Sequence, residues 1–200
     1  MLSWHGDYVN HPAGLLVCAS YCRHPRFNQS RLSRKHKDFM TLARRSSPTG
    51  KILLRRLKNA DLPGLAKLWL ASWQEAMPAI DFSARFQWFL AHLRTLEEKG
   101  FVTVCAIDGS DSIIGFVSID PATAYLDQLA VAPAAKGSGV ARILLDAARR
   151  ISPQGIVLDV NEDNGRALAF YKREGFEKIA EGVNPLSGLK TVRLRGPATL

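Results

Sequence analysis

Short apolar runs and stretches of helical periodicity alternate along the chain from residue 51 onward. Runs rich in apolar and β-branched residues predict strands at residues 52–57, 101–107, 112–119, 124–131, 155–160, 176–181 and 189–195. Apolar residues spaced three and four apart predict helices at residues 61–73, 82–96, 139–151 and 164–174. Asp61 is the expected N-cap of the first helix, and Gly100 and Gly175 are expected to end the second and the fourth.

The order of these elements predicts the fold class. The turn sequence DGSD at 108–111 separates two strands that we expect to pair as a hairpin. After Pro121 the order becomes strand, helix, strand, helix, which predicts one parallel crossover. We therefore expect an α/β fold with a mixed, mostly antiparallel sheet of six to seven strands, a central parallel crossover and about four flanking helices.

The first 49 residues lack sustained periodicity and are strongly basic. Residues 1–50 hold eight Lys and Arg against only Asp7 and Asp38, which gives +6 of the total charge of +9. We expect residues 1–49 to form a poorly ordered basic arm ahead of a domain at residues 51–196. Two alternatives stay open: an organelle transit peptide, and a true start at Met40 with the upstream codons untranslated.

Cysteine content and hydropathy indicate the cellular compartment of the protein. Three cysteines leave an odd thiol, and Cys105 in an apolar run is expected to be buried, which favours a reducing cytoplasm. Cys18, Cys22, His24 and His36 match no common zinc spacing, so we expect no metal. Nothing approaches the roughly 18 continuous apolar residues of a membrane span.

A glycine-rich loop joins the strand at 124–131 to the helix at 139–151. Its sequence, KGSGVA at 136–141, places little side chain where helix N–H groups lack partners, an arrangement that binds phosphate. The loop lacks the Lys-Ser/Thr pair of the nucleotide-binding P-loop. Arg142 stands where a dinucleotide-binding fingerprint needs its third glycine. The sequence therefore predicts an anion site of another kind.

This loop resembles the coenzyme A pyrophosphate loop of the GNAT N-acetyltransferase superfamily, Q/R-x-x-G-x-G/A. Lys136 stands at the first position, while Gly139 and Ala141 match. Lysine keeps the positive charge but loses arginine's planar fork. A second segment resembles the family's N-x-x-A-x-x-F-Y-x-x-x-G-F, with matches at Asn164, Ala167, Phe170, Tyr171, Gly175 and Phe176. Each segment alone is also compatible with an ordinary tight turn or a core contact, but together they support the resemblance, which covers residues 51–196.

The resemblance implies an enzyme that uses acetyl-CoA to acetylate an amine. It implies that the coenzyme is held by Leu129, Val131, Lys136, Gly137, Ser138, Gly139, Val140, Ala141 and Asn164. Because a phenol is protonated at neutral pH, Tyr171 is the candidate general acid for the departing thiolate. Asp127 and Asp159 are both candidates for the general base, and either could instead be a solvated strand residue or a helix-end partner.

Several alternatives remain open at this point. The chain could be an acyl-CoA sensor without turnover, or a nucleic-acid-associated protein using Arg23 to Lys37, although no aromatic stacking pattern accompanies that segment. The acceptor, a small-molecule or peptide amine, is not specified. Substrate selection is expected at residues 72–81 and 182–188, where Glu75 would favour a cationic amine. Relatives often form dimers, so a homodimer is also open.

Overall fold

The computed structural model describes residues 45–47, 50–78, 81–184 and 188–199. Most of the predicted basic arm, including the Cys18, Cys22, His24 and His36 group, lies outside the described residues. The predicted selection segments at 72–81 and 182–188 lie partly outside them. Within the described ranges no helix is long and apolar enough to cross a bilayer.

Five strands form the first sheet, in the order β1-β2-β3-β4-β5, and all neighbours are antiparallel. They are β1 (Arg45–Ser47), β2 (Gly50–Arg56), β3 (Val102–Ile107), β4 (Ile113–Ile119) and β5 (Leu126–Val131). The expected hairpin is present as β3 and β4. Strand β1 lies within residues 1–49, for which the sequence predicts a poorly ordered arm and no strand.

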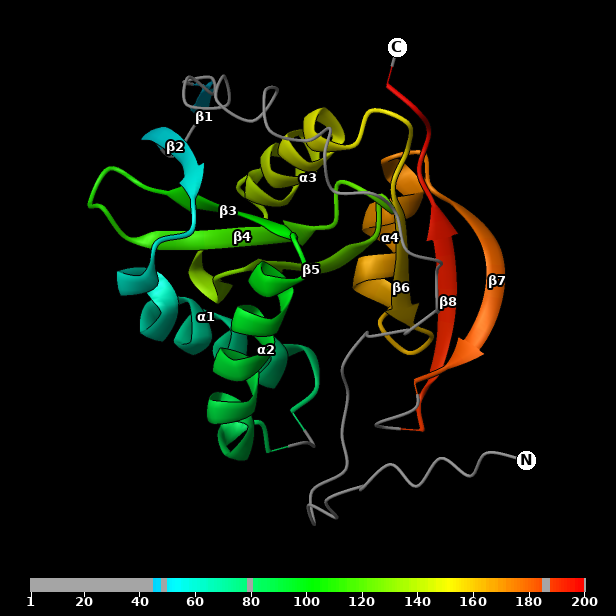
Figure 1. The fold of residues 1–200 in the computed structure, drawn as a ribbon, viewed down its shortest axis with the longest axis horizontal. Helices are drawn as coiled ribbons and strands as arrows, with labels where there is room; N and C mark the ends of the chain where they lie inside the picture. Colours follow the sequence, from blue (N-terminus) through cyan, green and yellow to red (C-terminus); the bar gives the residue numbers. More distant parts are fainter. Residues whose placement is uncertain (1–44, 48–49, 79–80, 185–187, 200) are drawn as a thin grey trace.

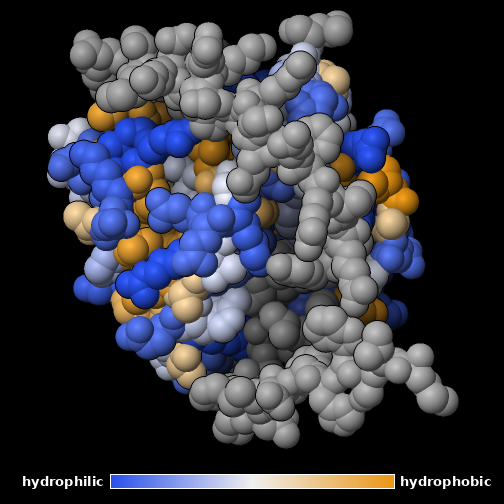
Figure 2. Space-filling model, viewed as in Figure 1, coloured by the Kyte–Doolittle hydropathy of each residue, from blue (hydrophilic) through white to orange (hydrophobic). Residues whose placement is uncertain are grey.

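Three strands form the second sheet, in the order β6-β8-β7, again antiparallel. They are β6 (Val157–Asn161), β7 (Glu177–Val183) and β8 (Lys190–Arg195). The last strand lies between the other two, which leaves β7 at an exposed edge (Figure 1). Apolar atoms show along that edge in Figure 2, in agreement with the exposed Ile179 and Val183.

Four helices cover the sheets: α1 (Leu62–Ala76), α2 (Phe86–Glu98), α3 (Val140–Ile151) and α4 (Gly165–Arg173). Helices α1 and α2 lie on one face of the first sheet and α3 on the other (Figure 1). Gly115 on β4 permits the close approach of α3, because a Cβ there would lie 2.9 Å from Leu144 Cδ1. The fold-class prediction is confirmed.

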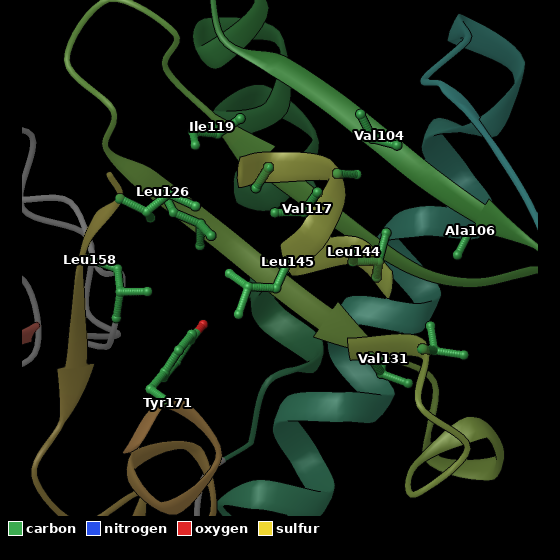
Figure 3. Packing of buried hydrophobic residues seen from close by; sticks show 14 of the residues in the cluster. Val104, Ala106, Val117, Ile119, Leu126, Val131, Leu144, Leu145, Leu158 and Tyr171 are labelled. Atoms are coloured by element: carbon green, nitrogen blue, oxygen red, sulfur yellow. The ribbon is translucent and has the colours of Figure 1, made fainter. Parts of the chain in front are cut away.

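Each face of the first sheet has its own apolar core. One core joins α3 and α4 to inward residues such as Val104, Val117 and Leu126 (Figure 3). The other joins α1 and α2 to Cys105 and Phe116, and it centres on Trp69, whose ring stacks on Phe89 with centroids 4.3 Å apart. Alternation of side chains along β3 thus supplies both cores.

The two sheets meet at one point. Tyr125 and Val157 form an isolated parallel bridge, in which the N–H of Val157 donates to the carbonyl oxygen of Ala124 at 3.0 Å. Beyond this bridge β5 and β6 separate, so the expected parallel crossover is confirmed but the sheet divides there. The separation leaves one edge of β5 without a neighbouring strand among the described residues.

Candidate active site

Two adjoining cavities lie where β5 and β6 separate. The larger, of about 310 Å³, is bordered by β5, the glycine loop and α4. The smaller, of about 80 Å³, lies between the start of β5 and the end of β6. They share four lining residues, Leu129, Asn164, Ala167 and Tyr171. A molecule in the larger cavity would therefore meet one in the smaller cavity at these residues.

Backbone conformation explains the two glycines of the loop. Gly137 has φ +85° and Gly139, the N-cap of α3, has φ +87°. A Cβ at either position would meet no atom within 4 Å, so glycine is required by the left-handed conformation and not by crowding. The space that a Cβ would enter is the space available to a ligand.

The glycine loop also presents backbone donors. Among the described residues, the N–H groups of Gly137, Gly139, Val140 and Ala141 have no hydrogen-bond acceptor. They lie at the positive end of the α3 dipole. Not every residue of the loop faces the larger cavity: Val140 is buried in the core, and the hydroxyl of Ser138 donates to the carbonyl oxygen of Ala135 at 2.6 Å. Val140 and Ser138 can therefore contact a ligand in the larger cavity only through their backbone atoms, or after their side chains move.

Positive charge surrounds the larger cavity. Its lining includes four cationic residues and no acidic one: Lys136, Arg142, Arg166 and Arg173. Lys136 Nζ lies 3.1 Å from Glu75 Oε2 at the end of α1. Backbone donors and cations together make this cavity suited to an anionic ligand with several phosphates.

The edge of β5 supplies further donors. The N–H of Ala132 donates to Ile114 on β4 at 2.9 Å. Alternation along the strand turns the N–H groups of Leu129 and Val131 the other way, toward the gap between the sheets. Leu129 and Val131, both predicted to hold the coenzyme, line the larger cavity.

Tyr171 and Asn164 come from the second motif. Tyr171 is buried on α4 and points toward the gap between β5 and β6 (Figure 3). Asn164 is the N-cap of α4, and its Oδ1 accepts a hydrogen bond from the N–H of Ala167 at 3.1 Å. That bond fixes the start of the helix and thus the position of Tyr171 two turns later.

The two candidate bases both line the smaller cavity but differ in their partners. Arg193 Nε and Nη2 donate to the two carboxylate oxygens of Asp159, each at 2.9 Å, and Tyr125 donates to Oδ2 at 3.1 Å. Among the residues that the structure describes, Asp127 receives donors on one oxygen only, Oδ2, from Gln128 Nε2 at 3.0 Å, with His92 Nε2 2.7 Å away.

His92 and Asn161 were missed by the sequence analysis. His92 lies on α2 between Phe89 and Leu96, and its spacing on the apolar face of that helix was the available signal. Asn161 lines the smaller cavity and is 4% exposed, and its Oδ1 has no hydrogen-bond partner within the described ranges. No group of three or more potential metal ligands occurs within the described part of the chain.

Residues 62–176 match the family model described as acetyltransferase (GNAT) family. A stretch of 72 residues, 36% of the chain, is 33% identical to peptidyl-lysine N-acetyltransferase YjaB of Escherichia coli (strain K12). That match covers 47% of YjaB, so the chain spans about half the length of this curated relative.

Solved structures that share the fold include the following two. The solution structure of apo-form YjaB from Escherichia coli superposes with a TM-score of 0.58 at 24% identity, covering 74% of this chain and 99% of that one. The PaiA N-acetyltransferase of Thermoplasma acidophilum, solved in complex with coenzyme A, gives a TM-score of 0.57 at 18% identity, covering 71% and 97%.

Proposed function

The chain belongs to the GNAT family of acetyltransferases, and from this premise we propose that it transfers the acetyl group of acetyl-CoA to a primary amine by direct attack in a ternary complex. The observation that carries the proposal is the pair of adjoining cavities that share Leu129, Asn164, Ala167 and Tyr171. One is positively charged and suits the coenzyme, and the other contains carboxylates and suits the amine.

The phosphates of the coenzyme bind at the glycine loop. The donors are the free N–H groups of Gly137, Gly139, Val140 and Ala141, with the charge of Lys136 beside them. Arg142, Arg166 and Arg173 line the same cavity and add charge for the remaining phosphate. This assignment is supported by a donor set that no described residue satisfies.

The pantetheine arm lies along the open edge of β5. Its amide groups pair with the backbone of Leu129 and Val131, and the same edge polarises the acetyl carbonyl as the tetrahedral oxyanion develops. Asn164 lines both cavities near this point. The arm thereby reaches Tyr171, whose phenol gives a proton to the departing thiolate.

Asp127 is the proposed base. Both oxygens of Asp159 are engaged by Arg193, whereas the described part of the chain places donors on Oδ2 of Asp127 only. Asp127 Oδ1 takes a proton from the acceptor ammonium, and the neutral amine attacks the acetyl carbonyl. Tyr171 protonates the sulfur and recovers a proton from the nitrogen of the new amide, so one proton is released in total.

The acceptor class follows from charge. Buried carboxylates beside the reacting centre favour a primary ammonium, such as a lysine side chain or a small aliphatic amine. A curated relative is named a peptidyl-lysine N-acetyltransferase, which supports the peptide option.

Residues 51–196 carry this activity in the proposal, and a homodimer and the role of residues 1–49 stay predictions. Cys105 is a free, buried thiol. Together with dependence on acetyl-CoA, that thiol supports a cytoplasmic location.

A thiol-release assay tests the function. The full chain is incubated with acetyl-CoA and a panel of amines, including lysine peptides, polyamines and aminoglycosides, and coenzyme binding is measured by calorimetry. Amine-dependent thiol release supports the enzyme. Binding without release on any amine would favour an acyl-CoA sensor instead, and absence of both would overturn the assignment.

A further inference from the structure

A chain of buried hydrogen bonds connects the two helices on one face of the sheet to the smaller cavity. Trp69 Nε1 on α1 donates to Gln128 Oε1 at 3.0 Å, and Gln128 Nε2 donates to Asp127 Oδ2 at 3.0 Å. His92 Nε2 on α2 lies 2.7 Å from the same oxygen. Three elements therefore fix one carboxylate.

His92 is itself held in place. Its ring stacks on Trp88 with centroids 4.8 Å apart and an interplanar angle of 17°, and its side chain is 12% exposed. The Asp127 side chain is 4% exposed. A carboxylate buried this deeply requires hydrogen-bond donors. The His92 imidazole, held in place by its stacking on Trp88, supplies one of them.

The donors are unevenly distributed over the carboxylate. His92 and Gln128 both reach Oδ2, and among the described residues no side chain reaches Oδ1. Asp127 lines the smaller cavity together with Asn161, whose buried Oδ1 also receives no hydrogen bond from any residue that the structure describes. The Asn161 side chain would have to turn to present this oxygen to the cavity. A primary ammonium carries three N–H donors, the groups that these oxygens lack.

We propose that His92 is a positioning residue of the amine site. It holds Oδ2 of Asp127 so that Oδ1 faces the acceptor nitrogen, while Asn161 accepts a second N–H of that nitrogen. The inference rests on the proposed function and deepens it, because it names the groups that receive a primary ammonium. Proton transfer then runs from the ammonium nitrogen to Asp127 Oδ1, and His92 itself does not touch the substrate.

Four variants of the full chain test the proposal. His92→Phe keeps the stacking on Trp88 but removes the donor, whereas His92→Gln restores an N–H donor at a similar reach. Asp127→Asn removes the base. The double variant His92→Phe/Asp127→Asn shows whether the two residues act as a unit.

A positioning role gives a distinct pattern. His92→Phe should lower kcat by about 10- to 100-fold, the factor that corresponds to one hydrogen bond to a charged group, with KM for acetyl-CoA unchanged. His92→Gln should recover most of that loss, and the double variant should be no slower than Asp127→Asn. Unchanged kcat in His92→Phe, or losses that multiply in the double variant, would overturn the proposal.

A second measurement does not depend on turnover. The ring nitrogens of His92, assigned in imidazole ¹⁵N spectra by comparison with His92→Gln, should shift when Asp127 becomes Asn. Identical His92 signals in the wild type and Asp127→Asn would show that the pair is absent in solution, which sinks the inference. If the His92 signals differ between the wild type and Asp127→Asn but the wild type acetylates no amine, the result would count against the proposed function and not against the His92–Asp127 pair.

Discussion

Lys136 Nζ lies 3.1 Å from Oε2 of Glu75, so the first residue of the glycine loop is paired with the end of α1. The other oxygen of Glu75 lies 3.8 Å from Arg166 at the start of α4. The Glu75 carboxylate thus lies close to two of the cations that border the larger cavity. A diphosphate that binds at the loop would compete with Glu75 for these two positive charges.

Glu75→Gln should therefore tighten coenzyme binding. Exposed ion pairs contribute about 0.2–1 kcal/mol, which corresponds to a decrease in the Kd for coenzyme A of roughly 1.4- to fivefold. Titration calorimetry at low and moderate salt measures this change in the Kd for coenzyme A. Glu177→Gln, an equal charge change on the exposed edge strand β7, is the matched control and should leave Kd near the wild-type value. Weaker binding in Glu75→Gln would contradict the competition.

Gly139→Ala should separate strain from ligand loss. A left-handed alanine at φ +87° costs about 1–2 kcal/mol, which lowers the melting temperature, and its Cβ would enter the proposed phosphate site. We expect a lower Tm and a large loss of coenzyme binding. Gly64→Ala, in a helix with no atom within 4 Å of the new Cβ, should keep Kd and raise Tm. Wild-type Kd in Gly139→Ala would exclude the loop as the phosphate site.

Tyr171→Phe should lose turnover and keep binding. The ring remains in the core, so packing is preserved, but the proton for the thiolate is lost, and general acid catalysis contributes about 10²- to 10⁴-fold. Steady-state kinetics and calorimetry on the same preparation measure the two effects. Tyr125→Phe also removes a phenol, one that bonds Asp159 at 3.1 Å, and should keep most of its turnover. Equal kcat in Tyr171→Phe and the wild type would remove Tyr171 from the mechanism.

Acid stability should depend on Asp61. The hydrogen bond from Arg55 lowers the pKa of the Asp61 carboxyl, with the backbone N–H of Lys58 adding to the effect at 2.8 Å. A lowered folded-state pKa gives stability that is present above the unfolded value, near 3.9, and is lost as pH falls through the folded value.

Asp61→Asn should therefore be destabilised by about 1 kcal/mol at neutral pH, and the difference from the wild type should shrink below about pH 4. Urea unfolding at several pH values measures this. Glu97→Gln on the exposed end of α2 controls for the change in net charge. A difference that grows on acidification would reverse the assignment.

Cys105 should resist alkylation while the protein is folded. Burial raises the pKa of its thiol to about 12, so almost no thiolate exists near pH 8. Mass spectrometry of the peptide that contains Cys105, after treatment with iodoacetamide, should show little modification until denaturant is added. Rapid labelling of the native protein would show that β3 opens readily.

Local pattern was enough to predict most of the fold. Helical spacing predicted α1 to α4, because each buries one stripe of apolar residues. Asp61 precedes α1 as predicted, but its carboxylate bonds Arg55 and the N–H of Lys58 instead of an N–H of the helix. The insertion of β8 between β6 and β7 was not predictable, because strand order depends on contacts distant in sequence.

The candidate site could be predicted from the sequence only where its residues lie in one segment. The loop at 136–141 and the motif containing Tyr171 are local, and the fold brings them to one cavity. The pairing of His92 with Asp127 joins residues 35 positions apart, and that of Arg193 with Asp159 joins residues 34 apart. Neither pair has a local sequence signal, and together these contacts distinguish two carboxylates that the sequence left equivalent.

The single bridge between Tyr125 and Val157 gives the molecule an unfinished sheet. Pantetheine carries two amides of its own and can enter the gap as a short surrogate strand. Bound in this way, the pantetheine arm would bridge the two sheets where β5 and β6 separate. Coenzyme binding should then slow amide hydrogen exchange in β5 and β6 together, because one ligand would contact both strands.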